Sequence, residues 1–436
     1  MTEAVIVATA RSPIGRAMKG SLVDLRPDDM SAQIVRALMD KVPEVQASDV
    51  EDLIMGCGQP AGEAGFNIGR MTAGLAGLDD VPGVTVNRYC SSSLQTIRMA
   101  AHAIKAGEGD CFISAGVEAV SRYGSGASDT APNPIFADAG KRTAERAEGG
   151  QPAGEAGFNI GRIVAGLAGL DDVPGVTVNR YCSSSLQTIR MAAHAIKSGE
   201  GDCFISAGVE AVSRYASGAS DTAPNPLFKE PGARTAARSE GGAETWAPPV
   251  GLPDFYIAMG QTAENVREVE GVTREEMDEF GARSQQRAVA AIARGHFENE
   301  ITPLTLPDGT VVSTDDGPRD GTTAEKLAGL KPVFRPDGEI TAGNACPRND
   351  GAAAVMVMSD TKAKALGLKP LARIVSSGVT GLNPEIMGLG PIEASRQAMA
   401  RAGMSAGDID LVEINEAFAA QVIPSAKHLG FSLDQV

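Results

Sequence analysis

A 92-residue segment occurs twice in direct succession in this chain. Residues 59–150 recur as residues 151–242, and an ungapped alignment of the two copies leaves 11 differing positions. A solenoid is built from shorter units and needs at least three of them, so this repeat does not predict one. It indicates a tandem duplication, or an error of sequence assembly, in a protein that needs one copy.

The two copies are expected to compete for one place in a parallel sheet. Copy one (59–150) continues from a predicted strand at 52–57, and copy two (151–242) continues into the downstream chain. Because loop-closure entropy grows slowly with length, neither arrangement is excluded. We expect copy one in the sheet and copy two as an insertion in a long surface connection. The copy left out would expose apolar helices and strand edges.

Each copy holds a cysteine between a predicted strand and a predicted helix. Val84 and Val86 favour a short buried strand, and the hydroxyls of Ser91–Ser93 suit a helix start. Cys90, or its copy Cys182, therefore lies at or just before the first turn of a helix, where the dipole favours a thiolate. This placement fits a nucleophile that accepts an acyl group, and it fits a buried structural cysteine equally well.

Strands alternate with helices along the chain, which predicts an α/β protein with a mainly parallel sheet covered by helices. The expected strands are 4–10, 52–57, 84–87, 111–115, 352–359 and 411–414, with a short strand pair within 301–320. The expected helices lie near 30–38, 67–78, 92–106, 275–295 and 391–402. Residues 371–379 are expected to start a second sheet.

Composition and charge restrict the partners. Hydrophobic residues at 43% and charged residues at 22% are typical of a globular protein. The net charge of -16 argues against general nucleic-acid binding, so an anionic ligand would need local positive sites. Without a membrane-length apolar run or a signal-peptide pattern, we expect a cytoplasmic protein that binds no membrane. The cysteine spacing predicts no metal site, and Cys57, Cys111 and Cys203 are expected to be small buried hydrophobes.

Five segments, in the same order, resemble the thiolase family of acetyl-CoA acetyltransferases and 3-ketoacyl-CoA thiolases. They are VATARSPIGR, NRYCSSSLQTIRMAAHAIKAGEGDCFISAGVEAVSR, DFYIAMGQTAENV, EKLAGLKPVFRPDGEITAGNACPRNDGAAAV and VEINEAFAAQ. The resemblance implies βαβαβαββ sheets covered by helices, with the C-terminal half incomplete, and a homodimer or homotetramer. The implied domains are an N-terminal half with the nucleophile (1–120) and a loop region with the duplication (121–250). The remainder of the loop region and the end of the N-terminal half follow (251–365), and a truncated C-terminal half comes last (366–436).

The resemblance also implies the site residues. The nucleophile falls on Cys90 or Cys182, and the asparagine that holds an oxyanion-hole water falls on Asn415, with Glu416 beside it. The residues matching segments that line the family's coenzyme A tunnel are Ala258, Met259, Gly343, Asn344, Cys346 and Phe418. For Cys346 itself we expect a structural role. Acyl-CoA and acetyl-CoA are the implied substrates, and no further cofactor is implied.

The implied reaction is ping-pong transfer through an acyl-cysteine, either cleaving 3-ketoacyl-CoA, as in fatty acid β-oxidation, or condensing two thioesters. The family's GHP histidine and second catalytic cysteine have no counterpart in these 436 residues. Such acid–base groups typically contribute about 10²–10⁴-fold each, so we expect impaired activity. Two alternatives remain: a non-catalytic fragment or acyl-CoA-binding module, and a β-ketoacyl synthase-like enzyme. The segments VEINEAFAAQ and TAGNACPRNDGAA favour the thiolase over the synthase.

Overall fold

The computed structural model describes most of the chain. The described residues are 2–60, 62–64, 67–124, 159–170, 172–180, 183–209, 229–242, 245–254, 257–378, 380 and 382–436. Of the predicted site residues, Cys182 lies outside these ranges.

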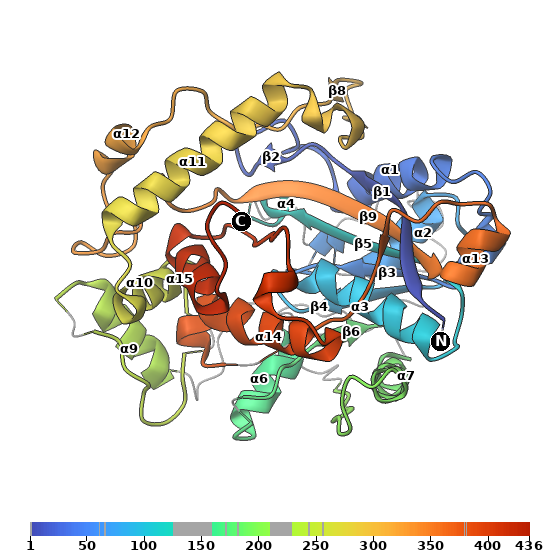
Figure 1. Cartoon of the computed structure of the whole chain (residues 1–436), viewed down its shortest axis with the longest axis horizontal. Helices are drawn as coiled ribbons and strands as arrows, with labels where there is room; N and C mark the ends of the chain where they lie inside the picture. The colour runs from blue at the N-terminus through green and yellow to red at the C-terminus, as the bar shows by residue number, and fades with distance from the viewer. Residues whose placement is uncertain are drawn as a thin grey trace, which may run out of the picture.

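A mixed sheet forms the centre of the molecule (Figure 1), with strand order β10-β1-β9-β5-β3-β4-β6 and β2 paired to β9. Its strands are β1 (Ala4–Arg11), β2 (Gly15–Arg16), β3 (Asp52–Gly56), β4 (Gly83–Asn87), β5 (Cys111–Ala119), β6 (Thr177–Asn179), β9 (Asn349–Ser359) and β10 (Ala372–Arg373). β3 is parallel to both β4 and β5, whereas β9 runs antiparallel to β1 and β5. The carboxyl ends of the three parallel strands therefore meet at one edge of the sheet.

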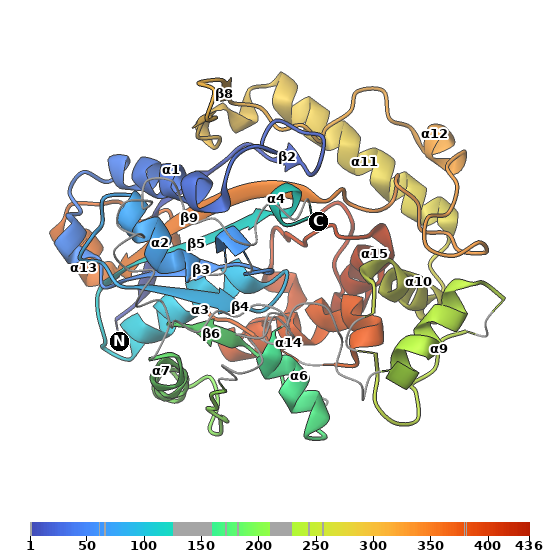
Figure 2. The ribbon, with the colours of Figure 1, turned by 180° about the vertical axis from the view of Figure 1, so that it is seen from behind.

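Helices cover both faces of this sheet. Figures 1 and 2 show α1 (Pro27–Asp40) and α2 (Ile68–Leu75) above it and α3 (Ser92–Lys105) below it. Along β5, Cys111 and Ile113 belong to the core under α1 and α2, while Phe112 belongs to the core over α3. This alternation is the period of two expected for a strand buried on both faces. The strands and helices predicted for the N-terminal half are thus confirmed. The expectation of a mainly parallel sheet is wrong, because among the described strands only the pairs of β3 with β4 and β5 are parallel, and β9 inserts antiparallel between β1 and β5.

Copy one occupies the sheet, as predicted. It supplies β4, α3 and β5, and copy two supplies β6, α6 (Ile160–Leu167) and α7 (Ser184–Lys197) at the outer edge of β4. Residues 203–209, which repeat the start of β5, form no strand and leave Phe204 and Ile205 exposed. Copy two, which is left out of the centre of the sheet, therefore exposes apolar side chains, as expected. Cys57 and Cys111 are buried as expected, but the expectation for Cys203 is wrong, because the sheet has no second place for its strand.

Apart from α4, the helices not yet described lie after residue 228. The remaining helices are α4 (Val120–Gly124), α9 (Lys229–Ser239), α10 (Met259–Glu270), α11 (Arg274–Ala293), α12 (Ala324–Ala328), α13 (Asp360–Ala365), α14 (Gly390–Ala402) and α15 (Ala419–Leu429). Short 3₁₀ turns lie at Ala47–Asp49, Gly62–Ala64, His296–Asn299, Pro384–Leu389 and Ala406–Asp408. Within the described ranges, each helix is too short or too polar to cross a lipid bilayer.

Two strand predictions fail in this part. Of the expected strand 371–379, the described residues 371–378 form only β10, which pairs with β1 in the main sheet instead of starting a second sheet. The expected strand at 411–414 has no neighbouring strand among the described residues, and Val412 donates its N–H to the carbonyl of Gln435 at 2.9 Å instead. The pair predicted within 301–320 is confirmed as β7 (Leu304–Thr305) and β8 (Val311–Val312).

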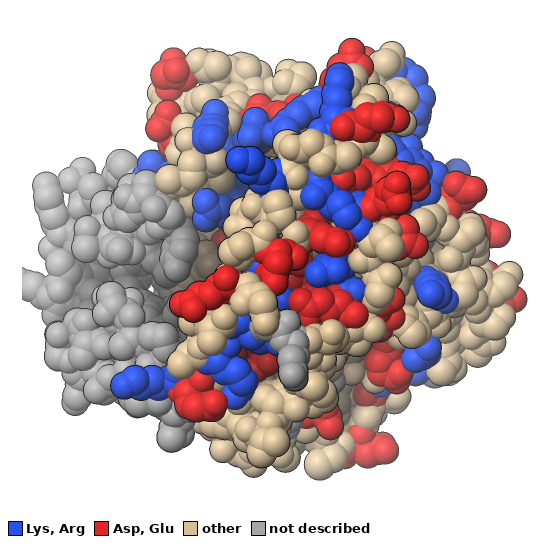
Figure 3. Space-filling view, turned by 90° about the vertical axis from the view of Figure 1, so that its left-hand side faces the viewer, with Lys and Arg blue, Asp and Glu red and all other residues tan. Residues whose placement is uncertain are grey.

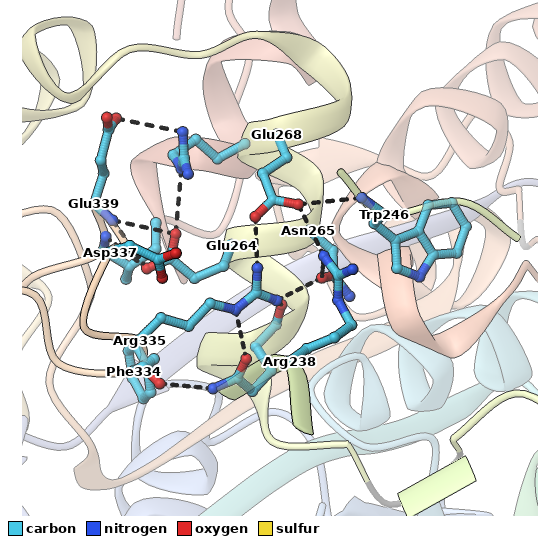
Figure 4. Close-up of polar contacts among 12 residues, drawn as sticks. Arg238, Trp246, Glu264, Asn265, Glu268, Phe334, Arg335, Asp337 and Glu339 are labelled. Atoms are coloured by element: carbon cyan, nitrogen blue, oxygen red, sulfur yellow. Dashed lines mark hydrogen bonds and ion pairs between the residues drawn. The ribbon is translucent and has the colours of Figure 1, made fainter. Parts of the chain in front are cut away.

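A buried polar network fastens α10 to the loop before β9 (Figure 4). Glu264 is fully buried, and its carboxylate accepts hydrogen bonds from the N–H groups of Glu339 at 3.1 Å and Ile340 at 3.0 Å. Arg335 donates to Glu268, one turn along α10, at 2.6 Å. Such a network in a low-dielectric interior holds its members in one arrangement. It therefore fixes the start of α10 relative to the segment that follows residue 340.

Glu264→Ala removes the acceptor from one buried and one partly buried backbone N–H group, so we expect it to lower the free energy of unfolding of this region by about 3 kcal/mol. Trp246, the only tryptophan of the chain, donates its backbone N–H to Glu268 at 3.2 Å and reports on this network. The measurement is urea unfolding followed by its fluorescence. Glu279→Ala, on the exposed side of α11, is the control. Equal urea midpoints for the two variants would contradict the assigned role.

Candidate active site

A strained turn between β4 and α3 presents Cys90. Tyr89 has a φ of 46°, in the left-handed region that residues with a side chain seldom adopt. The Asn87 side chain accepts the N–H of Tyr89 at 2.8 Å, and Ser92 Oγ accepts the N–H of Arg88 at 2.9 Å. Cys90 is exposed and lies two residues before α3 begins. The predicted position just before a helix is confirmed, and the role of the thiol remains a prediction.

Two glycines allow the first turn of α3 to lie directly on the sheet. A Cβ at Gly56, the last residue of β3, would lie 2.6 Å from the backbone nitrogen of Ser93. A Cβ at Gly116 of β5 would overlap the Ser93 hydroxyl. Only glycine leaves room for backbone at this distance, so these positions set how closely the Cys90 turn approaches the strand ends.

Gly56→Ala should displace the start of α3 and, with it, Cys90. A misplacement of about 1 Å can cost about 10²-fold in rate, so we expect the rate of Cys90 acylation to fall by about that factor. Gly232→Ala in α9, where an added Cβ meets nothing within 4 Å, should leave the rate unchanged. The measurement is single-turnover acylation by acetyl-CoA, with circular dichroism to verify folding. A Gly56→Ala protein that is acylated at the normal rate would refute the packing argument.

A carboxylate lies beneath this turn. The Glu118 carboxylate, on β5, accepts a hydrogen bond from the N–H of Gly58 at 2.9 Å. Glu118 is paired with Gly351 on the neighbouring strand β9. Burial raises the pKa of Glu118 to about 7, the charge of Asp350 acts in the same direction, and backbone hydrogen bonds from Gly58 and Gln59 oppose both. We did not single out Glu118 from the sequence. In the sequence, Glu118 is marked only as the charged residue of a mostly apolar strand.

The surroundings of Cys90 oppose ionisation of its thiol. Although the residue is exposed, burial of the sulfur by neighbouring protein raises the pKa of the Cys90 thiol, and the charge of Glu118 raises it further. The same two causes, in the same order, raise the pKa of the Cys57 thiol. The expectation of an acidic thiol at the helix start is therefore wrong for this structure. Desolvation and a nearby carboxylate both favour the neutral thiol.

Glu118→Gln removes the negative charge near Cys90 and should lower the pKa of its thiol. Because Glu118 itself has a pKa of about 7, its charge appears only as the pH rises through 7. We therefore expect iodoacetamide to alkylate Cys90 about two- to tenfold faster in Glu118→Gln than in the unmodified protein above pH 7, with little difference at pH 6. Glu44→Gln, on the exposed surface, serves as control. Identical rates at every pH would show that Glu118 does not act on the thiol.

Cys346 approaches Cys90 from the C-terminal side. Its N–H donates to the carbonyl of Ala417 at 3.0 Å, which ties it to the segment containing Glu416. Burial raises the pKa of the Cys346 thiol, and the negative charges of Cys90 and Glu416 raise it further. Charge on these groups acts over short distances only, so the two thiols and the carboxylate share one region. The Glu416 carboxylate also accepts a hydrogen bond from Ser284 of α11.

Apolar side chains border the same region. Residue Phe418 forms a β-bridge through Ala345, next to Cys346, and its ring packs edge-to-face against Phe334 at 6.3 Å between centroids. The Phe334 ring lies directly against Gly260, beside the exposed residues Ala258 and Met259 at the start of α10. Three predicted binding residues thus lie along one apolar surface, which suits a nonpolar chain.

The Asn344 side chain is hydrogen-bonded within the protein and connects its own loop to α11. Its side chain accepts the N–H of Thr341 at 2.8 Å and donates to Asp278 of α11 at 3.0 Å, so it is occupied within the protein. Gly343 packs closely too, since a Cβ there would lie 2.7 Å from the Leu327 side chain. Asn415 is exposed, and its carbonyl accepts a hydrogen bond from Gln421 at 2.7 Å. The structure therefore assigns contacts for Asn344 and Gly343 that hold the Cys346 segment in place.

The neighbouring surface has no uniform charge. Figure 3 shows basic and acidic side chains intermixed on the face that is turned toward the viewer there. Ion pairs among the residues of α9, α10 and the loop before β9 include Arg238 with Glu268 at 2.9 Å and Arg267 with Glu339 at 3.5 Å. An anionic ligand would accordingly depend on individual donors and not on a broad positive field.

Comparison with known proteins covers the whole chain. The family model "Thiolase, N-terminal domain" matches residues 4–144 and 148–361, and "Thiolase, C-terminal domain" matches residues 368–436. The C-terminal domain is therefore represented in the chain, although among its described residues only β10 forms a strand. The 3-ketoacyl-CoA thiolase of Bacillus subtilis is 33% identical over 449 residues, covering 100% of this chain and 86% of that protein. The acetyl-CoA acetyltransferase of Pseudomonas aeruginosa is 46% identical over 289 residues, covering 64% and 70%.

Solved structures agree with this match. The dimeric peroxisomal thiolase of Saccharomyces cerevisiae superposes with a TM-score of 0.69 at 27% identity, covering 100% of this chain and 84% of that one. The acetyl-CoA acetyltransferase of Bacillus anthracis gives a TM-score of 0.66 at 31% identity, covering 100% and 85%.

Proposed function

The chain belongs to the thiolase family of acyltransferases, and we propose that it transfers acyl groups between coenzyme A thioesters through Cys90. One observation carries this proposal. Cys90 is exposed on a strained turn at the start of α3, in the same region as Cys346 and Glu416 of the C-terminal segment. An exposed sulfur held beside a helix start, with backbone donors around it, suits attack on a thioester carbonyl.

We propose the following first half-reaction. The Cys90 sulfur attacks the thioester carbonyl, the new S–C bond forms, and coenzyme A leaves as its thiolate. The proton lost from Cys90 passes to a base, and Glu118 is the carboxylate whose charge acts on this thiol. N–H groups at the start of α3, together with a water held by Asn415, would stabilise the oxyanion.

In the condensing direction, the α-carbon of acetyl-CoA loses a proton to a base and attacks the acyl-cysteine carbonyl; the C–S bond breaks and Cys90 leaves as the thiolate, which regains a proton. In the cleaving direction, Cys90 instead attacks the 3-keto carbon of a 3-ketoacyl-CoA, the C2–C3 bond breaks, and acetyl-CoA leaves with a proton taken up at its α-carbon. Coenzyme A then attacks the acyl-cysteine and releases Cys90. The apolar surface of Met259, Phe334 and Phe418 would receive the nonpolar part of the substrate. We propose acyl-CoA and acetyl-CoA as substrates of a cytoplasmic enzyme.

We also propose that steady-state turnover is slower than this first acylation. The chain has four histidines, all described, and each lies against a glutamate. The pairs are His102 with Glu200, His194 with Glu108, His296 with Glu300 and His428 with Glu270. With the histidines paired in this way and the Cys90 thiol weakly acidic, the acid–base contribution of about 10²–10⁴-fold per group is reduced.

Radiolabelled acetyl-CoA tests the nucleophile. The unmodified protein and Cys182→Ala should take up label, whereas Cys90→Ala should lose it by about 10³-fold or more, because the attacking atom is gone. Cys203→Ala, which removes another exposed cysteine, is the control. Label that survives in the Cys90→Ala/Cys182→Ala protein would refute both assignments. Coenzyme A binding by calorimetry without any labelling would favour an acyl-CoA-binding module.

A further inference from the structure

The two copies of the repeat meet across a local two-fold axis. Strand β6 of copy two pairs antiparallel with β4 of copy one. The paired residues are Thr85–Asn179, Val86–Val178 and Asn87–Thr177. Since each residue of copy two is 92 positions after its counterpart, Val86 meets its own copy, and Thr85 and Asn87 each meet the copy of the other. A contact in which i meets j and j meets i is the mark of an isologous interface.

The helices beside these strands repeat the same symmetry. Arg98 of α3 donates to Glu200 at 2.8 Å, and Nε2 of His102 lies 2.8 Å from the same carboxylate. The counterparts are Arg190 with Glu108 at 2.8 Å and His194 with Glu108. Both charged clusters lie between α3 and α7, which have identical sequences. Although burial acts against it, His102 and Arg98 lower the pKa of Glu200 to about 2.

The contact also has an apolar centre. Val86 and Met99 of copy one lie in one core cluster with Val178 of copy two, and Val176 and Met191 of copy two pack against that cluster. Copy two reproduces the local fold of copy one as well: Asn159, like Asn67, adopts a left-handed conformation before its helix. Copy two therefore presents a folded, self-matching surface to copy one.

One half of this interface is incomplete. Arg180 of copy two pairs with Asp52, a residue that precedes the duplicated segment and therefore occurs once. The counterpart of Arg180 is Arg88, which has no carboxylate partner among the described residues, whereas the buried Nε atoms of both arginines lack a hydrogen-bond partner there. Burial, followed by the charge of Arg98, lowers the pKa of Arg88 to about 9. A complete second chain would bring its own Asp52 to this place, whereas copy two cannot.

We propose that copy two occupies the face with which this protein would otherwise bind a second copy of itself. Residues 159–170, 172–180 and 183–200 act as an internal partner for β4 and α3, so the 436-residue chain is a monomer. Release of copy two exposes the edge of β4, the charges of α3 and the unpaired Arg88, and two chains then associate through copy one. The homodimer or homotetramer implied by family resemblance is thus replaced by a contact within one chain.

The test measures mass by sedimentation velocity at micromolar concentration. The full chain should have the mass of one chain. Val178→Pro/Glu200→Arg breaks β6 and reverses the charge facing Arg98 and His102, and should double the mass. Adding Glu108→Arg should return the mass to one chain, because the released face needs Glu108 for Arg98 and His102 of the other chain. Adding Glu44→Arg instead, at an exposed position away from this face, should leave the dimer intact.

Excision of residues 151–242 provides a second variant, in which no internal partner remains. If the excised chain folds, as verified by circular dichroism, and is a dimer, the proposal is supported. If the excised chain does not fold, a dimer of the Val178→Pro/Glu200→Arg chain supports it instead. A dimer of the unmodified chain would overturn it. A folded monomer after excision, or an unchanged mass for Val178→Pro/Glu200→Arg, would overturn it equally.

Discussion

The close contact between the first turn of α3 and the sheet is the constraint on which the site depends. Glycines at positions 56 and 116 add no side chain of their own at this contact, so the backbone of Ser93 rests on β3 and its hydroxyl rests on β5. The chain leaving β4 must therefore turn sharply, and Tyr89 takes up that strain. Cys90 follows in the turn and is exposed as a consequence. Its location is set by backbone packing, which is why it depends little on the rest of the repeat.

The same packing disfavours ionisation of the Cys90 thiol. The strand ends that support Cys90 also bring Glu118 beneath it, and both burial and this carboxylate favour the neutral thiol. A nucleophile in this setting relies on transfer of its proton during attack and not on a thiolate formed beforehand. On the other side, burial and the charges of Cys90 and Glu416 raise the pKa of the Cys346 thiol, so this second thiol is also favoured in its neutral form. The site therefore suits substrates that arrive with a polarised carbonyl, as thioesters do.

Much of the N-terminal half could be predicted from the sequence, because each segment there has a clear periodicity and a neighbour to pair with. The position of Cys90 before a helix followed from the serines and the apolar spacing after it. The preference for copy one in the sheet followed from its unbroken connection to β3. Strand 411–414 could not be predicted correctly, because strand propensity has no effect without a neighbouring edge, and Val412 bonds to Gln435 instead.

Glu118 and the two-fold contact of the copies could not be predicted either, since both depend on which strands lie side by side. The tryptic peptide YCSSSLQTIR is identical in the two copies, so peptide mapping of the unmodified chain does not distinguish Cys90 from Cys182. The most direct measurement is therefore mass spectrometry of Cys182→Ala protein quenched in acid after exposure to acetyl-CoA. The account predicts one acetyl group on the peptide containing Cys90. An acetyl group on Cys346 with the Cys90 peptide unmodified would contradict it.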